Sequence, residues 1–292
     1  MEIKSVAVIG SGTMGNGIAH VFALSGFSVL LVDIREEYLQ NALKTIQKNL
    51  ERHVRKEVIT EESARQALER IATSISLEDC RETEVVIEAV VEDLKIKKDI
   101  FSRLDRISKK EAIFATNTSS LSITTLAAST NRSQQFIGMH FMNPVPVMKL
   151  VEIIRGLTTS DETCQTIINL AKQVGKVPVE VNDFPGFISN RILMPMLNEA
   201  MFCLMEGVAE KESIDTVMKL GMAHPMGPLE LADFIGLDVC LAIMEVLYTG
   251  FRDSKYRPCP LLVKMVSAGY LGRKTGKGFY EYPAEKNRNS NR

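Results

Sequence analysis

The 292-residue sequence predicts an α/β domain followed by an all-α domain. Short apolar strands alternate with helical patterns up to about Val181, which is typical of a doubly wound parallel sheet. A glycine-rich turn joins the first strand to the first helix, and from Asp183 onward only helical patterns occur. We therefore expect an α/β domain over residues 1–183 and a helical domain over residues 184–292.

The first strand, expected over 3–9, leads directly into the pattern G-x-G-x-x-G formed by Gly10, Gly12 and Gly15. Gly10 permits a tight turn, Gly12 lets the backbone approach a pyrophosphate, and Gly15 lets the following helix lie close to the strand. The helix N-terminus offers N–H groups to phosphates. This context predicts a Rossmann-type dinucleotide-binding domain. The alternative is a turn that only packs a helix on a sheet.

A second strand, expected over 27–32, ends in Asp33, at the distance from the glycine motif at which a ribose-binding acid occurs. A carboxylate there accepts hydrogen bonds from the ribose hydroxyls and repels a 2′-phosphate. Asp33 therefore favours NAD over NADP, whereas the cationic Arg35, two residues later, is a feature that points towards NADP.

Composition limits the classes of partner. The formal net charge of −1 gives no reason to expect nucleic acid or a membrane surface as a partner. The five cysteines include no C-x-x-C pair, so we expect neither a disulfide framework nor a metal site, and a reducing cytoplasm fits best. The N-terminus shows no targeting segment, and no apolar run approaches the length that spans a bilayer.

A basic stretch follows in the next predicted helices. Residues 35–68 show helical spacing with a break and a new N-cap near Thr60. The first of these helices carries Arg52 and Lys56, one turn apart, among other basic residues. Such a stretch is either a solvated helix face or a landing site for a phosphorylated ligand.

Polar residues follow the next two predicted strands, at 84–90 and 112–116. Glu92 lies just beyond the first strand, and Asn117 and Ser119 follow the second. In an open α/β sheet ligands bind outside the carboxyl ends of strands, so these three residues are candidates for contact with a cofactor or substrate. Each could instead be a loop polar group or a helix cap.

His140 ends a further predicted strand, 136–140, and Glu152 lies on the following one, 149–154. If these strands pair antiparallel, the two side chains come within hydrogen-bonding distance. A histidine transfers protons near neutral pH, and a carboxylate neighbour orients the ring and stabilises its cationic form. The pair is therefore the candidate chemical centre, against the alternative of a structural histidine.

The remaining elements follow from helical spacing and one more strand pattern. Further helices are expected at about 94–107, 160–174, 187–206, 210–220, 228–235, 237–247 and 260–267, and a strand at 177–181. The helix over 187–206 contains Pro195 and a long apolar stripe. Such a stripe is either core or a shared dimer interface.

Together these motifs resemble the L-3-hydroxyacyl-CoA dehydrogenases, and most closely the short bacterial 3-hydroxybutyryl-CoA dehydrogenases. The resemblance covers nearly the whole chain, and its specificity comes from the order and spacing of the motifs. The matching segments are 10–15, 88–93, 117–121, 140–146, 149–152 and 185–191.

The resemblance implies hydride transfer between NAD and C3 of an (S)-3-hydroxyacyl-CoA, which gives the 3-oxoacyl-CoA, or the reverse. His140 is similar to the general base of the family, and Glu152 to the residue that pairs with it. Ser119 and Asn190 match positions that hydrogen-bond the substrate oxygens and the surroundings of the histidine.

The resemblance also assigns binding residues. Around the nicotinamide half of the cofactor it places Glu92, Lys97, Asn117 and Asn143. The cofactor residues expected from the glycine motif and the second strand are Gly10, Gly12, Thr13, Met14, Gly15 and Asp33. Arg52 and Lys56 match the region that binds the nucleotide end of coenzyme A. The resemblance also implies a role in fatty acid or butanoate metabolism, and the long apolar stripe of the helix over 187–206 favours a homodimer through the C-terminal helical domain.

Two other functions compete with this interpretation. A related dehydrogenase could act on a free hydroxy acid or sugar acid, in which case the basic helix has no phosphates to bind. A redox sensor could bind NAD without turnover, in which case the four residues expected to contact the reacting groups have no use.

Overall fold

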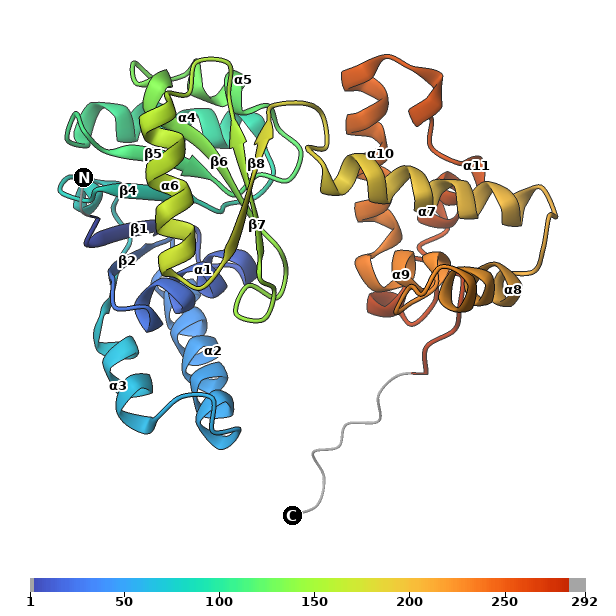
Figure 1. Ribbon diagram of the computed structural model, residues 1–292, viewed down its shortest axis with the longest axis horizontal. Coiled ribbons are helices and arrows are strands. Elements are labelled where there is room, and N and C mark those ends of the chain that lie inside the picture. Colours follow the sequence, from blue (N-terminus) through green and yellow to red (C-terminus); the bar gives the residue numbers. More distant parts are fainter. Residues whose placement is uncertain (1–2, 284–292) are drawn as a thin grey trace. The chain divides into compact units, whose positions relative to one another are not determined.

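The computed structural model describes residues 3–283. These residues form two compact units that divide after Phe184 (Figure 1). The first unit is built on one eight-stranded sheet, and the second unit is helical. The predicted fold class, a Rossmann-type domain followed by an all-α domain, is confirmed.

The strands of the first unit lie in the order β3-β2-β1-β4-β5-β6-β7-β8. Their bounds are β1 Ser5–Ile9, β2 Ser28–Val32, β3 Ile71–Ser74, β4 Val85–Glu88, β5 Ile113–Thr116, β6 Phe136–Phe141, β7 Leu150–Arg155 and β8 Val177–Asn182. Neighbouring strands are parallel except β6 and β7, which pair antiparallel. Chain order reverses at β1, between β2 and β4, so a ligand crevice is expected at the carboxyl ends of these strands.

Helices cover both faces of the sheet. They are α1 Thr13–Leu24, α2 Glu36–Arg55, α3 Glu61–Glu69, α4 Leu94–Ile107, α5 Ile123–Ala127 and α6 Asp161–Gln173. Apolar residues of α1, α2 and α6 form one core with strand residues such as Val8 and Ile153. Phe101 of α4 packs edge-on against Phe136 of β6, with 4.6 Å between ring centroids. Both faces of the sheet are therefore shielded from solvent, which explains why the central strands consist almost entirely of apolar residues.

The second unit contains α7 Ser189–Met205, α8 Lys211–Thr216, α9 Pro228–Ile235, α10 Leu237–Phe251 and α11 Pro260–Ser267. Pro195 lies inside α7. Much of the apolar stripe of α7, including Met194, Leu197 and Met201, is buried in the core of this unit. The carboxylate of Asp215 caps α9 by accepting from Leu229 N at 2.8 Å. The α7 stripe therefore serves largely as internal core.

The structure differs from the sequence-based expectations in a few elements. The strand predicted over 3–9 begins at Ser5 in the structure, and the strand predicted over 84–90 is confined to Val85–Glu88. Strand β3 and helix α5 were not anticipated, because each is short and its residues show no clear apolar period. None of the described helices has both the length and the apolar character needed to cross a bilayer.

His20 of α1 makes the stability of the first unit sensitive to acid. The side chain is 1% exposed, and neither ring nitrogen has a hydrogen-bond partner among the described residues. Burial, followed by the nearby His53 and Lys176, lowers the pKa of His20 from 6.5 to about 4. A histidine in the unfolded chain keeps its ordinary pKa, so between these two values only the unfolded state takes up the proton.

The free energy of unfolding is therefore expected to fall as the pH drops from 6.5 towards 4, with His20 accounting for about 3 kcal/mol of the loss. In a His20→Leu variant this part of the acid destabilisation should disappear. Urea unfolding at a series of pH values measures it. Identical pH slopes for the variant and the wild type would contradict the assignment.

Candidate active site

The three glycines of the first turn serve different purposes. Gly10 has φ +96°, and a Cβ on it would lie 2.7 Å from Ala89 O. A Cβ on Gly15 would lie 1.7 Å from Gly10 O. Both glycines are therefore required by the fold itself. A Cβ on Gly12, in contrast, would meet no described atom within 4 Å, so the room beside Gly12 is available to a ligand.

The N-terminus of α1 lies at this turn. Gly12 is its N-cap, and the described residues provide neither a side-chain cap nor an acidic residue in its first turn. Helices α3 and α4, by comparison, are capped by Thr60 and Asp93. The first N–H groups of α1 are therefore suited to an anion, and together with the space beside Gly12 they fit the pyrophosphate of a dinucleotide.

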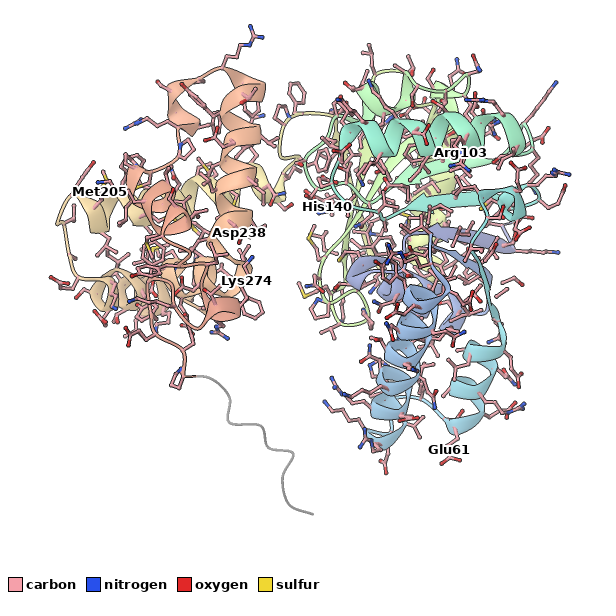
Figure 2. The ribbon with its side chains drawn as sticks, turned by 180° about the vertical axis from the view of Figure 1, so that it is seen from behind. Glu61, Arg103, His140, Met205, Asp238 and Lys274 are labelled. Carbon is pink, nitrogen blue, oxygen red and sulfur yellow. The ribbon has the colours of Figure 1, made fainter. Side chains whose placement is uncertain are left out.

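A cavity of about 660 Å³ opens at the carboxyl ends of β1, β2 and β4. Its lining includes Gly10, Gly12, Thr13 and Asp33, and it extends to Arg103 of α4, which is labelled in Figure 2. Met14 and Gly15 are not among the described residues that line it. Met14 packs against the apolar core, and Gly15 closes the turn.

The carboxylate of Asp33 is held in a fixed orientation at this cavity. Oδ2 accepts hydrogen bonds from Ser11 N at 2.7 Å and Ser11 Oγ at 2.6 Å, and Oδ1 accepts one from Ile34 N at 2.7 Å. A negatively charged hydrogen-bond acceptor in a fixed orientation suits ribose hydroxyls and disfavours a further phosphate. The cavity, the turn and this carboxylate together fit NAD.

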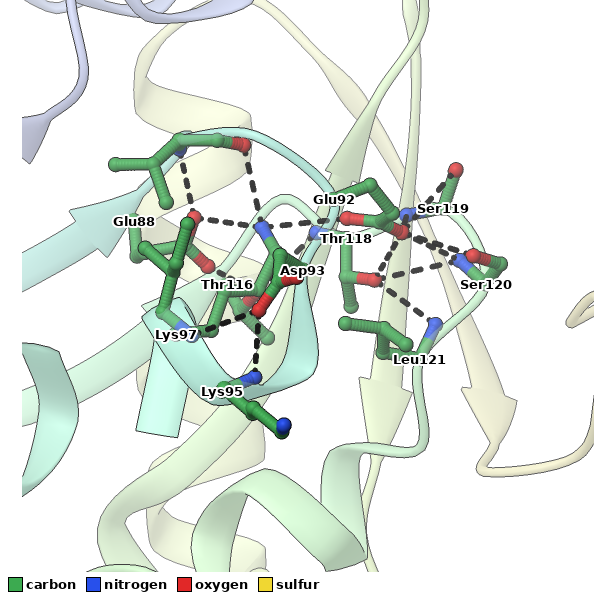
Figure 3. Close-up of polar contacts among 12 residues, drawn as sticks. Glu88, Glu92, Asp93, Lys95, Lys97, Thr116, Thr118, Ser119, Ser120 and Leu121 are labelled. Carbon is green, nitrogen blue, oxygen red and sulfur yellow. Dashed lines mark hydrogen bonds and ion pairs between the residues drawn. The ribbon is translucent and has the colours of Figure 1, made fainter. Parts of the chain in front are cut away.

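A buried ionic cluster lies at the end of β4 (Figure 3). Lys97 Nζ donates to Glu88 Oε1 at 2.6 Å and lies 3.2 Å from Glu92 Oε2. The side chains of Lys97 and Glu88 are 1% and 0% exposed. Burial raises the pKa of Glu88, although Lys97 and Thr116 act in the opposite direction. Burial acts in the same sense on Glu92, but Lys97 and the hydroxyl groups around it bring the pKa of Glu92 below its ordinary value.

Glu92 links this cluster to the loop that follows β5 (Figure 3). Its Oε1 accepts hydrogen bonds from Thr118 Oγ1 at 2.5 Å, Ser119 N at 3.0 Å and Ser120 Oγ at 2.9 Å. The structure thus brings together Glu92 and Ser119, which the sequence had placed at neighbouring strand ends, and Lys97 of α4, which only the resemblance had indicated. The carboxylate of Glu92 fixes the backbone that carries Ser119.

His140 and Glu152 lie opposite each other in the antiparallel pair of β6 and β7, as predicted. His140 Nδ1 is 2.8 Å from Glu152 Oε2, and the two residues are 8% and 2% exposed. Because an ionised carboxylate only accepts, Nδ1 carries the proton in this bond. In that tautomer Nε2, the other ring nitrogen, is the one that can take up a proton.

Two asparagines stand close to His140 in the chain or in the sheet. Asn117, at the end of β5, accepts a hydrogen bond from Phe141 N at 2.9 Å through Oδ1. This bond fixes the end of β6 directly after His140. Asn143 is exposed in the turn that follows β6.

The residues expected to hold coenzyme A are exposed. Arg52 lies in the last turn of α2, and Lys56 is the C-cap of that helix. A cavity of about 520 Å³ between α2 and α3 is lined by Arg55 and Arg65, among others, but neither Arg52 nor Lys56 is among its described lining residues. Asn190 belongs to the second unit, where it is buried in the first turn of α7.

Two residues of the site were missed in the sequence. Glu88 ends a strand that is otherwise apolar, and a carboxylate in a fully buried strand is itself a signal of a paired charge. Ser11 carries no such signal, because serine is ordinary inside a glycine-rich turn. No group of three or more metal-ligating side chains occurs among residues 3–283.

A dinucleotide-binding sheet with a buried histidine–glutamate pair at the end of β6, followed by a helical unit, defines an NAD-dependent oxidoreductase. Residues 5–184 match the model of the 3-hydroxyacyl-CoA dehydrogenase NAD binding domain, and residues 186–282 match that of the 3-hydroxyacyl-CoA dehydrogenase C-terminal domain. The chain belongs to the 3-hydroxyacyl-CoA dehydrogenase family.

Known proteins resemble the chain over almost its full length. A probable 3-hydroxybutyryl-CoA dehydrogenase of Bacillus subtilis is 57% identical over 97% of this chain and 98% of its own. The mitochondrial hydroxyacyl-coenzyme A dehydrogenase of Homo sapiens is 44% identical over 96% of this chain and 91% of its own. The crystal structure of an (S)-3-hydroxybutyryl-CoA dehydrogenase from Ralstonia eutropha superimposes with a TM-score of 0.95 at 53% identity, covering 96% of this chain and 99% of that one.

Proposed function

We propose that the chain oxidises (S)-3-hydroxyacyl-CoA, and 3-hydroxybutyryl-CoA in particular, to the 3-oxoacyl-CoA with NAD, and catalyses the reverse reduction. The observation that carries this proposal is the buried His140–Glu152 pair at the carboxyl edge of the dinucleotide-binding sheet. The names of the similar proteins support the substrate class.

His140 transfers the proton in this proposal. NAD, when bound, accepts the hydride that leaves C3 of the substrate. His140 takes the proton of the 3-hydroxyl group at Nε2, while Glu152 holds the ring through Nδ1 and stabilises the imidazolium. In the reverse direction His140 returns this proton to the oxygen of the 3-oxo group.

Ser119 and Asn190 hydrogen-bond the substrate oxygens in this proposal. The backbone of Ser119 is held by Glu92, which supports a fixed position for its side chain. Glu92 and Lys97 accordingly act on the site through the loop as well as at the nicotinamide half of the cofactor.

The cofactor residues divide between its two halves. Gly12 and Thr13 at the N-terminus of α1 hold the pyrophosphate, and Asp33 holds the adenosine ribose. Met14 and Gly15 shape the same turn from its inner side. Asn117 and Asn143 are assigned to the nicotinamide half, which their places after β5 and in the turn after β6 support.

The units divide the work in this proposal: residues 1–183 bind NAD, and residues 184–292 bind the acyl chain and form a homodimer. Large apolar side chains that are more than half exposed on the second unit, such as Ile192, Leu220 and Phe234, support the dimer. Sedimentation giving a monomer at micromolar concentration would contradict it. The five cysteines, all unpaired thiols, support a reducing cytoplasm, and the substrate places the enzyme in fatty acid or butanoate metabolism.

The direct test is a spectrophotometric assay of acetoacetyl-CoA with NADH, alongside acetoacetate with NADH and acetoacetyl-CoA with NADPH. We expect oxidation of NADH with the thioester and much slower reactions in the other two mixtures. Preference for the free acid would favour a hydroxy-acid dehydrogenase. Binding of NADH without turnover of either substrate would favour a redox sensor.

The basic end of α2 provides a second test. Replacing Arg52 and Lys56 by alanine should raise the KM for acetoacetyl-CoA by about three- to tenfold with little change in kcat, because two phosphate contacts are lost. Assays at low salt, with acetoacetyl-pantetheine as a substrate that lacks the nucleotide, measure the effect.

The matched control for this test removes Lys44 and Lys48, which are exposed on the same helix at the same spacing. This double variant should keep the wild-type KM for both substrates. An equal rise in KM for both double variants would indicate a general charge effect, and an unchanged KM in the variant of Arg52 and Lys56 would contradict their assignment.

A further inference from the structure

Lys176 is a buried lysine that the proposed mechanism does not use. It directly precedes β8 and is 8% exposed. Its Nζ donates to Val145 O at 2.5 Å and to Met148 O at 2.8 Å. Among the described residues no carboxylate lies within ion-pair distance of this ammonium group, so two backbone carbonyls take the place of a counter-ion.

Both carbonyls belong to the turn between β6 and β7, residues 142–149, which we call the 142–149 turn. In it Pro144 O accepts hydrogen bonds from Val147 N at 3.0 Å and Met148 N at 2.9 Å. The turn thus closes on itself like a single turn of helix, and such a turn leaves carbonyl groups without partners at its end. The ammonium group of Lys176 donates hydrogen bonds to two of these carbonyl groups, and its positive charge also interacts favourably with their dipoles.

The same turn also packs against α1. The side chain of Val145 is 2% exposed, and a Cβ added to Gly17 of α1 would lie 2.9 Å from Val145 Cβ. Glycine at this position therefore lets the turn lie directly on the helix whose N-terminus is assigned to the pyrophosphate. Lys176 therefore binds the turn at Val145 and Met148, and α1 contacts it at Val145.

This arrangement matters for the site because of what the turn connects. It begins two residues after His140, carries Asn143, and leads into the strand of Glu152. We propose that Lys176 is a positioning residue for cofactor binding: by fixing the 142–149 turn against α1, it places Asn143 at the nicotinamide half of NAD. This inference rests on the proposed role of Asn143 and adds to it the group that determines where that side chain lies.

A lysine that served only the stability of the sheet would affect cofactor binding independently of Asn143. A positioning residue acts through Asn143, so its loss changes little once Asn143 is gone. The two cases are separated by a double-mutant cycle, in which coupled residues give non-additive effects.

The test measures the Kd of NADH by fluorescence titration for the wild type, Lys176→Met, Asn143→Ala and the double variant. We expect Lys176→Met alone to raise Kd by about three- to tenfold, within the range for the loss of one hydrogen bond, here the one that Asn143 makes to the cofactor. In the Asn143→Ala background the same change should alter Kd by less than about twofold. Additive effects, or an unchanged Kd in Lys176→Met, would overturn the proposal.

Two further variants complete the experiment. Lys172→Met removes an exposed lysine of α6 and should leave Kd unchanged. Gly17→Ala displaces the 142–149 turn through the side chain of Val145 and should also raise Kd in a manner that depends on Asn143. This variant covers the case in which Lys176→Met does not fold. Because the readout is NADH binding, a wild type that binds NADH but does not reduce acetoacetyl-CoA would contradict the proposed function separately from this inference.

Discussion

Replacing His140 by alanine is expected to lower the turnover of acetoacetyl-CoA by about 10²–10⁴-fold while NADH binding stays near the wild-type level. The expected loss is large because the substitution removes the ring nitrogen that gives a proton to the oxygen on C3 in this direction. NADH binding is spared because the turn after β1 and the carboxylate of Asp33 after β2 are unaffected. Steady-state kinetics together with fluorescence titration of NADH measure both quantities.

His224→Ala is the control for this prediction, since His224 is a half-buried histidine of the second unit. It should retain turnover within a small factor. Near-wild-type turnover in His140→Ala would remove this histidine from the mechanism. Loss of NADH binding in step with turnover would instead point to a folding defect.

Replacing Lys97 by methionine is expected to lower the free energy of unfolding by about 3–5 kcal/mol. The substitution leaves the carboxylate of Glu88, which is 0% exposed, without the cation that lies 2.6 Å away. An uncompensated charge in the interior is the reason for the large effect. Urea unfolding of the variant against the wild type measures the loss.

Two comparisons separate this explanation from a packing defect. Adding Glu88→Gln to the Lys97→Met variant should restore much of the stability, because the buried charge is then removed. Lys95→Met, on an exposed position of the same helix, should change stability by less than about 0.5 kcal/mol. Equal stability of the single and the double variant would contradict the role of Glu88.

The loss in Lys97→Met should also depend on pH. Burial already raises the pKa of Glu88, and without Lys97 that pKa rises further. A carboxyl whose pKa is raised in the folded state destabilises the fold above its unfolded pKa and does so less as the pH falls. The deficit of the variant should therefore be smaller in mildly acid solution than in alkaline solution.

Much of the fold could be predicted because its signals are local. The helix expected over 94–107 is observed with these bounds. Asp93 caps its start, because its side chain accepts hydrogen bonds from Lys95 N and Ile96 N. Strand β3, in contrast, lies at the sheet edge with none of its residues fully buried. Its four residues have no clear apolar period, so only its pairing with β2 reveals it.

Those site residues that lie at the ends of strands could be placed from the sequence. The antiparallel pairing of His140 and Glu152 followed from two strands and a short connection. The partners of Glu92 did not follow, because hydrogen bonds to Thr118 and Ser120 depend on a loop conformation that no local pattern specifies. Lys176 likewise has the sequence appearance of a surface lysine, and only tertiary structure shows that it is buried.

The central claim is that His140 and Glu152 act as one proton-transfer unit, and the pH dependence of kcat/KM for oxidation of 3-hydroxybutyryl-CoA tests it most directly. Oxidation requires the neutral imidazole, so the rate should fall towards acid pH. In Glu152→Gln the maximal rate should decrease and the acid limb should move to lower pH, because the imidazolium has lost its carboxylate partner. An acid limb at the same pH in both proteins would contradict the account.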